Sequence, residues 1–251
     1  MSYPIRKTLV AATLVIASLT LAASTNRNTI ADSPKTSVAT ETNMSTPSPA
    51  PAPAPNPDSN IHEGAMAAAA IYSGAGLKKA GLNQRAFELA WEAYESLEEE
   101  GRIEKSDLLT VIDFSQPSTK KRLYVIDVDD QKILYQCVVS HGRNTGALWA
   151  KKFSNRVGSN MSSPGLYLTA ETYMGGNGYS LRLDGLDRGI NDNARRRAIV
   201  MHGAPYASES TIRSLGYLGR SQGCPALPVS ISKKVINTIK GGSVLYIYAP
   251  Q

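Results

Sequence analysis

Cysteine and histidine are scarce in this sequence. Its 251 residues include only two cysteines, Cys137 and Cys224, and three histidines, which lie far apart at positions 62, 141 and 202. Two cysteines are too few for a fold built on disulfides or for a cysteine-rich zinc site. Neither an HExxH helix nor a CxxC pair occurs, so the sequence predicts no metal and no other cofactor.

Acidic residues are fewer than basic ones. The chain has 21 Asp and Glu against 27 Lys and Arg, which gives a formal net charge of +6. This balance favours anionic partners such as nucleic acid, acidic lipid or bacterial cell wall, but its sign alone does not choose among them. The densest basic run, Arg195-Arg196-Arg197, is typical of a solvated face and comes with no nucleic-acid recognition motif. We therefore expect no nucleic-acid partner.

The N-terminal residues have the pattern of an export signal followed by a tether. Arg6 and Lys7 precede an apolar run from Leu9 to Ala23, which is short for a membrane span of about 20 apolar residues. We expect residues 1–24 to be a signal peptide that is cleaved rather than kept as an anchor. The protein would then be exported, periplasmic or associated with the cell envelope, without stable membrane insertion. Residues 25–60 are rich in Ser, Thr, Ala and Pro and predict a disordered linker, or simply a disordered N-terminus without function.

Residues 61–105 predict a helical segment. Within it, the stretch 83–101 is amphipathic, and its stripe is expected to pack in a core rather than to bind a ligand. The apolar residues recur at three- and four-residue steps: Phe87, Ala90, Trp91, Tyr94 and Leu97.

Residues 106–251 predict a mainly β domain. Short runs of β-branched and aromatic residues, separated by Gly, Asn, Asp, Pro and Ser, indicate about seven strands. Asp129-Asp130 fits a hairpin turn between two of them. One further helix is expected at residues 231–240, ended by Gly241-Gly242.

Two segments of this domain carry residues suited to nucleophilic catalysis. In IVMHGAPY a strand delivers His202 into a turn, and in GRSQGCPALP a loop holds Cys224, which lies 22 residues later. A nucleophilic cysteine needs a base in reach and N–H donors for the oxyanion. Because Pro225 has no N–H, these donors must come from the backbone of Gln222, Gly223 or Cys224. Cys137 lies within a strand-like run and is expected to be a buried, inert thiol.

These two segments together resemble the catalytic signature of L,D-transpeptidases of the YkuD type. The likeness covers roughly residues 83–249. Within the family, the sequence resembles the branch of murein L,D-transpeptidase catalytic domains. It is carried by DFSQPSTKKRLYVIDV, VSHGRNTG, FSNRVGSNMSSPGLYLTAETYMGGNGYSLRLDGL, GINDNARRRAIVMHGAPY and GRSQGCPALP. Common members have His-Gly-Cys followed by Arg or Asn two residues later, whereas here Gln222 precedes Gly223 and Pro225-Ala226 follow the cysteine.

The resemblance implies a fold and a reaction. The fold would be a β-sandwich or barrel with a few helices, preceded by an N-terminal helix. Cys224 would attack a peptidoglycan stem tetrapeptide, release the terminal D-Ala and form a thioester, which the amine of another stem would resolve. His202 would serve as the base, oriented by a backbone carbonyl rather than by an acidic residue.

Four further residues are predicted to bind substrate. Arg143 and Asn144 would meet substrate carboxylates by charge complementarity, and Ser221 belongs to the Ser-x-Gly-Cys signature. His141 ends a strand beside a glycine, which suits the rim of the cleft and suits a structural role equally well.

Three other interpretations stay open at this stage. The same Cys-His pair would serve a peptidoglycan L,D-carboxypeptidase or amidase, in which water resolves the thioester. A non-catalytic wall-binding module would keep the fold alone. Oxidation of Cys137 and Cys224 to a disulfide would block the nucleophile altogether.

Overall fold

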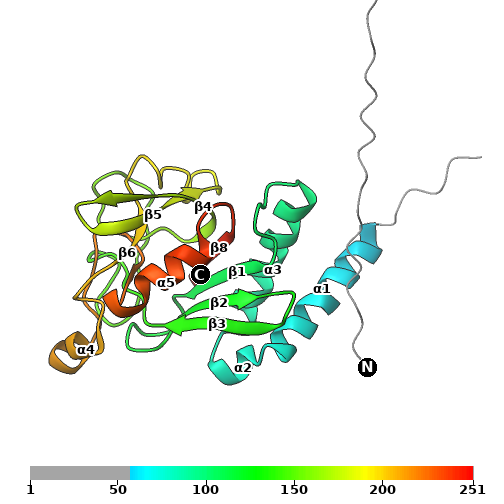
Figure 1. The fold of residues 1–251 in the computed structure, drawn as a ribbon, viewed down its shortest axis with the longest axis horizontal. Helices are drawn as coiled ribbons and strands as arrows, with labels where there is room; N and C mark the ends of the chain where they lie inside the picture. Colours follow the sequence, from blue (N-terminus) through cyan, green and yellow to red (C-terminus); the bar gives the residue numbers. More distant parts are fainter. Residues whose placement is uncertain (1–56, 251) are drawn as a thin grey trace, which may run out of the picture. The chain divides into compact units, whose positions relative to one another are not determined.

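The structure, a computed structural model, describes residues 57–250 (Figure 1). The expected signal peptide, residues 1–24, and residues 25–56 of the expected linker lie outside the described residues. The last part of that linker, residues 57–60, belongs to the first helix. None of the described helices is long and apolar enough to cross a membrane.

Helices and strands follow one another along the chain in the order shown in Figure 1. The elements are α1 (Pro57–Gly74), α2 (Leu77–Ala80), α3 (Gln84–Glu99), β1 (Leu108–Asp113), β2 (Leu123–Asp127), β3 (Lys132–Cys137), β4 (Gly165–Gly175), β5 (Gly178–Gly185), β6 (Val200–Gly203), α4 (Glu209–Leu215), β7 (Ala226–Leu227), α5 (Val229–Ile239) and β8 (Val244–Tyr248).

The amphipathic helix expected near residues 83–101 is α3. The side chain of Asn83 caps its first turn by accepting a hydrogen bond from the N–H of Ala86, as a good N-cap residue does. The predicted apolar stripe is buried along its whole length. This stripe packs on β1 and β8, so the prediction of core packing is confirmed.

A single mixed sheet of eight strands forms the body of the domain, in the order β3-β2-β1-β8-β4-β5-β6-β7. Neighbours are antiparallel except for the parallel pairs β1–β8 and β6–β7. An isolated bridge joins Ser140, just after β3, to Ala226 of β7. Because this bridge links the two edges, the sheet curls into a nearly closed barrel, and the expected mainly β fold is confirmed.

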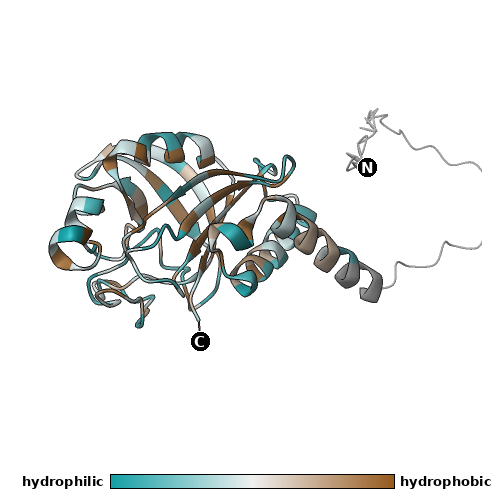
Figure 2. Cartoon of the chain, turned by 90° about the horizontal axis from the view of Figure 1, so that it is seen from below, coloured by the Kyte–Doolittle hydropathy of each residue, from teal (hydrophilic) through white to brown (hydrophobic). Residues whose placement is uncertain are grey.

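Residues that alternate along the central strands divide the core between the two faces of the sheet. In β1, Leu109 and Val111 pack in the cluster that includes α3, whereas Leu108 and Ile112 pack in the cluster that includes α5. This is the two-residue period of a strand with both faces buried. Figure 2 shows the apolar residues concentrated along these strands.

The predicted strands correspond to β1–β6 and β8, and the predicted hairpin turn at Asp129-Asp130 joins β2 to β3. The helix expected at residues 231–240 is α5, which begins two residues earlier, at Val229. Two elements were not anticipated, namely the short helix α4 and the two-residue strand β7. The strand β7 positions the candidate active site.

Candidate active site

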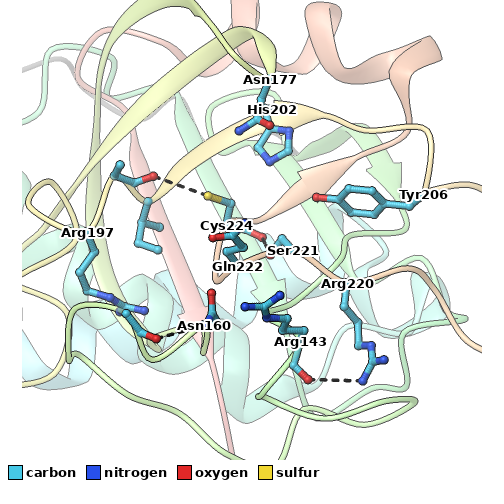
Figure 3. Close-up of a pocket in the computed structure, with 13 residues that line it drawn as sticks. Arg143, Asn160, Asn177, Arg197, His202, Tyr206, Arg220, Ser221, Gln222 and Cys224 are labelled. Carbon is cyan, nitrogen blue, oxygen red and sulfur yellow. Dashed lines mark hydrogen bonds between the residues drawn. The ribbon is translucent and has the colours of Figure 1, made fainter.

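The pairing of β6 with β7 brings His202 and Cys224 together. His202, in β6, is the register partner of Ala226 in β7, and Cys224 lies two residues before Ala226. Both side chains line one cavity of about 480 Å³ (Figure 3). The cavity is lined by Arg143, Gly158, Asn160, Asn177, Arg197, Ala198, Ile199, His202, Tyr206, Arg220, Ser221, Gln222 and Cys224.

The thiol of Cys224 lies at the floor of this cavity, and the residue is only 8% exposed. Its sulfur accepts a hydrogen bond from the N–H of Val200 at 3.5 Å. It donates one to the carbonyl oxygen of Ala198 at 3.6 Å (Figure 3). Ala198 has φ of +55°, a left-handed conformation that costs free energy for a residue other than glycine. Burial raises the pKa of the Cys224 thiol, whereas the N–H of Val200 and the charge of Arg197 lower it.

His202 is held in the tautomer that a general base requires. Its Nδ1 lies 3.0 Å from the carbonyl oxygen of Gly203, which can only accept, so Nδ1 carries the proton and Nε2 is left with its lone pair. Burial lowers the pKa of His202, which keeps the ring neutral near pH 7. In the part of the chain that the structure describes, no hydrogen bond joins this ring to the thiol.

Hydroxyl groups hold the loop around the cysteine. Ser221 Oγ accepts from the N–H of Gly223 at 3.0 Å and donates to the carbonyl oxygen of Cys224 at 2.6 Å. Ser162 Oγ donates to the carbonyl oxygen of Gly223 at 3.0 Å. Gly223 has φ of +126°, and a Cβ there would lie 2.7 Å from the carbonyl oxygen of Met161, so only glycine fits.

This arrangement corrects the predicted oxyanion donors. The N–H of Gly223 is already bonded to Ser221, so Gly223 does not supply a free donor. Within residues 57–250, the backbone N–H groups of Gln222 and Cys224 donate to no other residue, and the N–H of Cys224 helps to lower the pKa of its own thiol. Ser221 lines the cavity, but both hydrogen-bonding functions of its hydroxyl are used within the loop.

His141 is not at the rim of the cleft. The residue is 1% exposed and does not line the cavity. Its Nδ1 accepts from the buried guanidinium of Arg122 at 2.8 Å, and its Nε2 donates to the carbonyl oxygen of Gly146 at 3.1 Å. Burial and the charge of Arg122 lower the pKa of His141 to about 4. The prediction of substrate binding is therefore wrong, and the ring supports the loop that follows it.

That loop carries the other two residues predicted to bind substrate. Arg143 is exposed and lines the cavity, as expected. The side chain of Asn144 instead donates to the carbonyl oxygen of Ser159 at 2.8 Å and is not among the lining residues. Asn144 therefore joins two loops and does not face the cavity.

Sequence reasoning missed all the other charged or aromatic lining residues, namely Arg197, Arg220 and Tyr206. Arg195, in the same basic run as Arg197, does form a surface ion pair with Glu171 and Asp184, but Arg197 turns inward. With Arg143, the cavity has three arginines among its lining residues and no carboxylate. The lining is therefore positively charged, which attracts anions.

The second cysteine takes no part in this site. Cys137 lies at the end of β3, buried, and both cysteines are free thiols. Burial raises the pKa of Cys137 to about 12. Cys137 is therefore buried as predicted, and in this structure it forms no disulfide with Cys224; that its thiol is inert stays a prediction.

Comparison with known proteins places this geometry in a family. The profile of the L,D-transpeptidase catalytic domain matches residues 78–248. The chain belongs to this family. The match includes both segments that line the cavity beside β6 and β7. No curated protein matches the chain at a significant level.

Solved structures of L,D-transpeptidases are among its structural neighbours. One from Mycobacterium smegmatis is 15% identical, with 57% of this chain and 59% of that chain covered and a TM-score of 0.36. One from Stackebrandtia nassauensis is 15% identical, with 66% and 67% covered and a TM-score of 0.35. The helical cell shape determining protein Pgp2 of Campylobacter jejuni is 13% identical, with 63% and 54% covered and a TM-score of 0.39. The matched part of this chain spans less than two thirds of the length of the first of these.

Proposed function

We propose that this member of the family is an exported peptidoglycan L,D-transpeptidase in which Cys224 is the nucleophile and His202 the general base. One observation carries the proposal: the β6–β7 pairing sets His202 opposite Ala226, so that a thiol and a neutral imidazole line the same cavity. The free N–H groups of Gln222 and Cys224 lie beside that thiol and suit an oxyanion.

The first half of the reaction forms a thioester. The thiol leaves the carbonyl oxygen of Ala198 and transfers its proton to Nε2 of His202. The sulfur attacks the carbonyl carbon between the diacid third residue and the terminal D-Ala of a stem tetrapeptide. The C–N bond then breaks, the amine of D-Ala takes the proton from His202, and D-Ala departs.

The second half transfers the acyl group to a new amine. The amine of another stem attacks the thioester carbon and gives a proton to His202. The C–S bond breaks, and the proton returns to the sulfur of Cys224. If water attacks in place of the amine, the same site acts as an L,D-carboxypeptidase, and this is the second candidate function.

The charge of the cavity supports this substrate class. A stem peptide carries carboxylates on its diacid residue and at its end, and Arg143 and Arg220 lie together on one side of Cys224 (Figure 3). Arg220 donates to the backbone carbonyl oxygen of Arg143 at 3.3 Å, which holds the Arg220 side chain beside the backbone that carries Arg143. Guanidinium groups bind carboxylates in pairs of hydrogen bonds.

Mass spectrometry of purified muropeptides incubated with the protein tests the proposal. Wild type is expected to release D-Ala and to give cross-linked dimers, Cys137→Ser to match it, and Cys224→Ala to give neither. Tripeptides without dimers would establish the carboxypeptidase. If wild type and both variants all left the muropeptides unchanged, the proposal would be wrong. A non-catalytic wall-binding module would then be the remaining interpretation.

A further inference from the structure

Arg197 carries a positive charge that no acidic residue neutralises. The side chain is half-buried, and all of its hydrogen-bond partners are neutral oxygens on the segment 154–163: the carbonyl oxygen of Ser154 at 2.7 Å, Ser163 Oγ at 3.1 Å, Ser159 Oγ at 3.2 Å and the carbonyl oxygen of Met161. None of the ion pairs among residues 57–250 includes this guanidinium. Both of its terminal nitrogens, Nη1 and Nη2, have acceptors, but none of these acceptors carries a charge.

This charge lies next to the segment that holds the nucleophile. Arg197 Nη2 is 3.3 Å from where a Cβ on Gly223 would stand, one residue before Cys224. Arg197 also directly precedes Ala198, whose carbonyl oxygen accepts the hydrogen bond of the thiol. Figure 3 shows Arg197 on one side of Cys224, with Arg143, Arg220 and Tyr206 on the other.

Burial opposes the charge separation that the reaction needs. It raises the pKa of the Cys224 thiol and lowers that of His202, so a proton transfer between them is uphill without help. A nearby positive charge stabilises a thiolate. The other charged or titratable groups that line the cavity are His202, Tyr206, Arg143 and Arg220, and none is an anion near pH 7 that would cancel the effect of Arg197.

We propose that Arg197 is the residue that stabilises the thiolate of Cys224, and that its hydrogen bonds to residues 154–163 position it for this role. The inference rests on the proposed function in taking Cys224 as the nucleophile. The step itself is one proton transfer, from the sulfur to Nε2 of His202, and Arg197 neither gives nor takes a proton. It acts on the reacting atom through its charge.

The test is the pH profile of alkylation at Cys224 by iodoacetamide, a neutral electrophile that reads the thiolate directly. A Cys137→Ser parent leaves one thiol to label. In Arg197→Gln the midpoint of the profile is expected to rise by about one unit, which is about tenfold slower labelling at any pH well below the midpoint. Arg197→Lys keeps the charge without the planar set of hydrogen bonds and is expected to stay near the parent. Arg196→Gln, a neighbouring exposed charge, is the matched control.

A second pair of variants leaves Arg197 in place. Ser159→Asp sets a carboxylate against the guanidinium and is expected to raise the midpoint as Arg197→Gln does, while the similarly sized, neutral Ser159→Asn is expected not to. If Arg197→Gln does not fold, these two Ser159 variants still test whether the charge of Arg197 stabilises the thiolate. The proposal is overturned if Ser159→Asp matches Ser159→Asn, or if Arg197→Lys shifts the profile as far as Arg197→Gln. Because labelling needs no peptidoglycan, a shifted profile together with inactive muropeptide assays would refute the transpeptidase and leave the role of Arg197 intact.

Discussion

Ser221→Ala is expected to weaken both the fold and the reaction. The Ser221 hydroxyl is the single partner shown for the N–H of Gly223 and for the carbonyl oxygen of Cys224, and the side chain is buried. Removing it strands two backbone groups, each worth about 1–3 kcal/mol when buried. Because the cavity lets water reach part of this loop, we expect the lower end, a loss of about 2 kcal/mol in the free energy of unfolding, or about 4–8 °C in melting temperature.

The same change is expected to reduce the rate beyond its effect on stability. The Ser221 hydroxyl fixes the turn that carries the N–H groups of Gln222 and Cys224. An oxyanion donor that is lost outright costs about 10²–10³-fold in rate, so donors that are only misaligned are expected to cost about tenfold or more. Muropeptide turnover measured well below the unfolding transition reports this loss.

Urea unfolding with an unchanged m-value checks the stability term. Ser214→Ala is the control, because Ser214 is exposed and its hydroxyl bonds only to its own helix, at the carbonyl oxygen of Thr211. The reasoning would be refuted by a Ser221→Ala protein whose stability and turnover both equal those of Ser214→Ala. Ser162→Ala, which frees the carbonyl oxygen of Gly223, is expected to combine with Ser221→Ala in a non-additive way, since both act on one turn.

Three further predictions follow from the described residues. His202→Gln is expected to slow muropeptide turnover by about 10²–10⁴-fold, and a loss below about threefold would assign the base elsewhere. The pKa of His141 is about 4 in the fold and 6.5 as its ordinary value. The unfolded chain therefore binds more protons between these values, and stability falls by about 3 kcal/mol as the pH drops from 6.5 to 4. Denaturation at both pH values should show a smaller fall in stability for His141→Gln than for wild type. An equal fall in the two proteins would mean that His141 is not the cause. Finally, removal of residues 1–56 is expected to leave turnover unchanged, because the helix that packs on α3 begins at Pro57; an insoluble or inactive product would contradict this.

Most of the fold was predictable because burial on both faces leaves a strong pattern in the strands. Short runs of apolar, β-branched and aromatic residues marked β1 and β8, and the three- and four-residue steps marked α3. The strand β7 is different, since two residues have no periodicity. It exists because β6 and the residues after β3 offer it hydrogen bonds, and both partners are distant in the sequence.

The site was predictable where a residue type is rare and was not where it is common. A cysteine between glycine and proline stands out, as does a histidine at the end of a strand. His141, like His202, lies at the end of a strand and is followed by a glycine. Its ring is nevertheless hydrogen-bonded to the buried Arg122, and no local sequence signal reveals this contact. Arg197 stands in a run of three arginines whose first member does lie on the surface. Only the fold decides which of them turns inward.

If Cys224 is the nucleophile, its resting state affects which substrates react with it. Its thiol donates a hydrogen bond to the carbonyl oxygen of Ala198 and not to His202, and burial favours the neutral forms of both the thiol and the ring. The resting site is therefore not a preformed thiolate-imidazolium pair, unlike cysteine enzymes with a strongly lowered thiol pKa. Activation requires the thiol to turn away from Ala198, which breaks one weak hydrogen bond. A ligand whose carboxylates are held at Arg143 and Arg220 would keep its carbonyl near the sulfur. It would then be in place when the thiol turns away from Ala198. We therefore expect this arrangement to favour anionic stem peptides over neutral acyl donors. The preference would arise at the step in which the thiol turns away from Ala198.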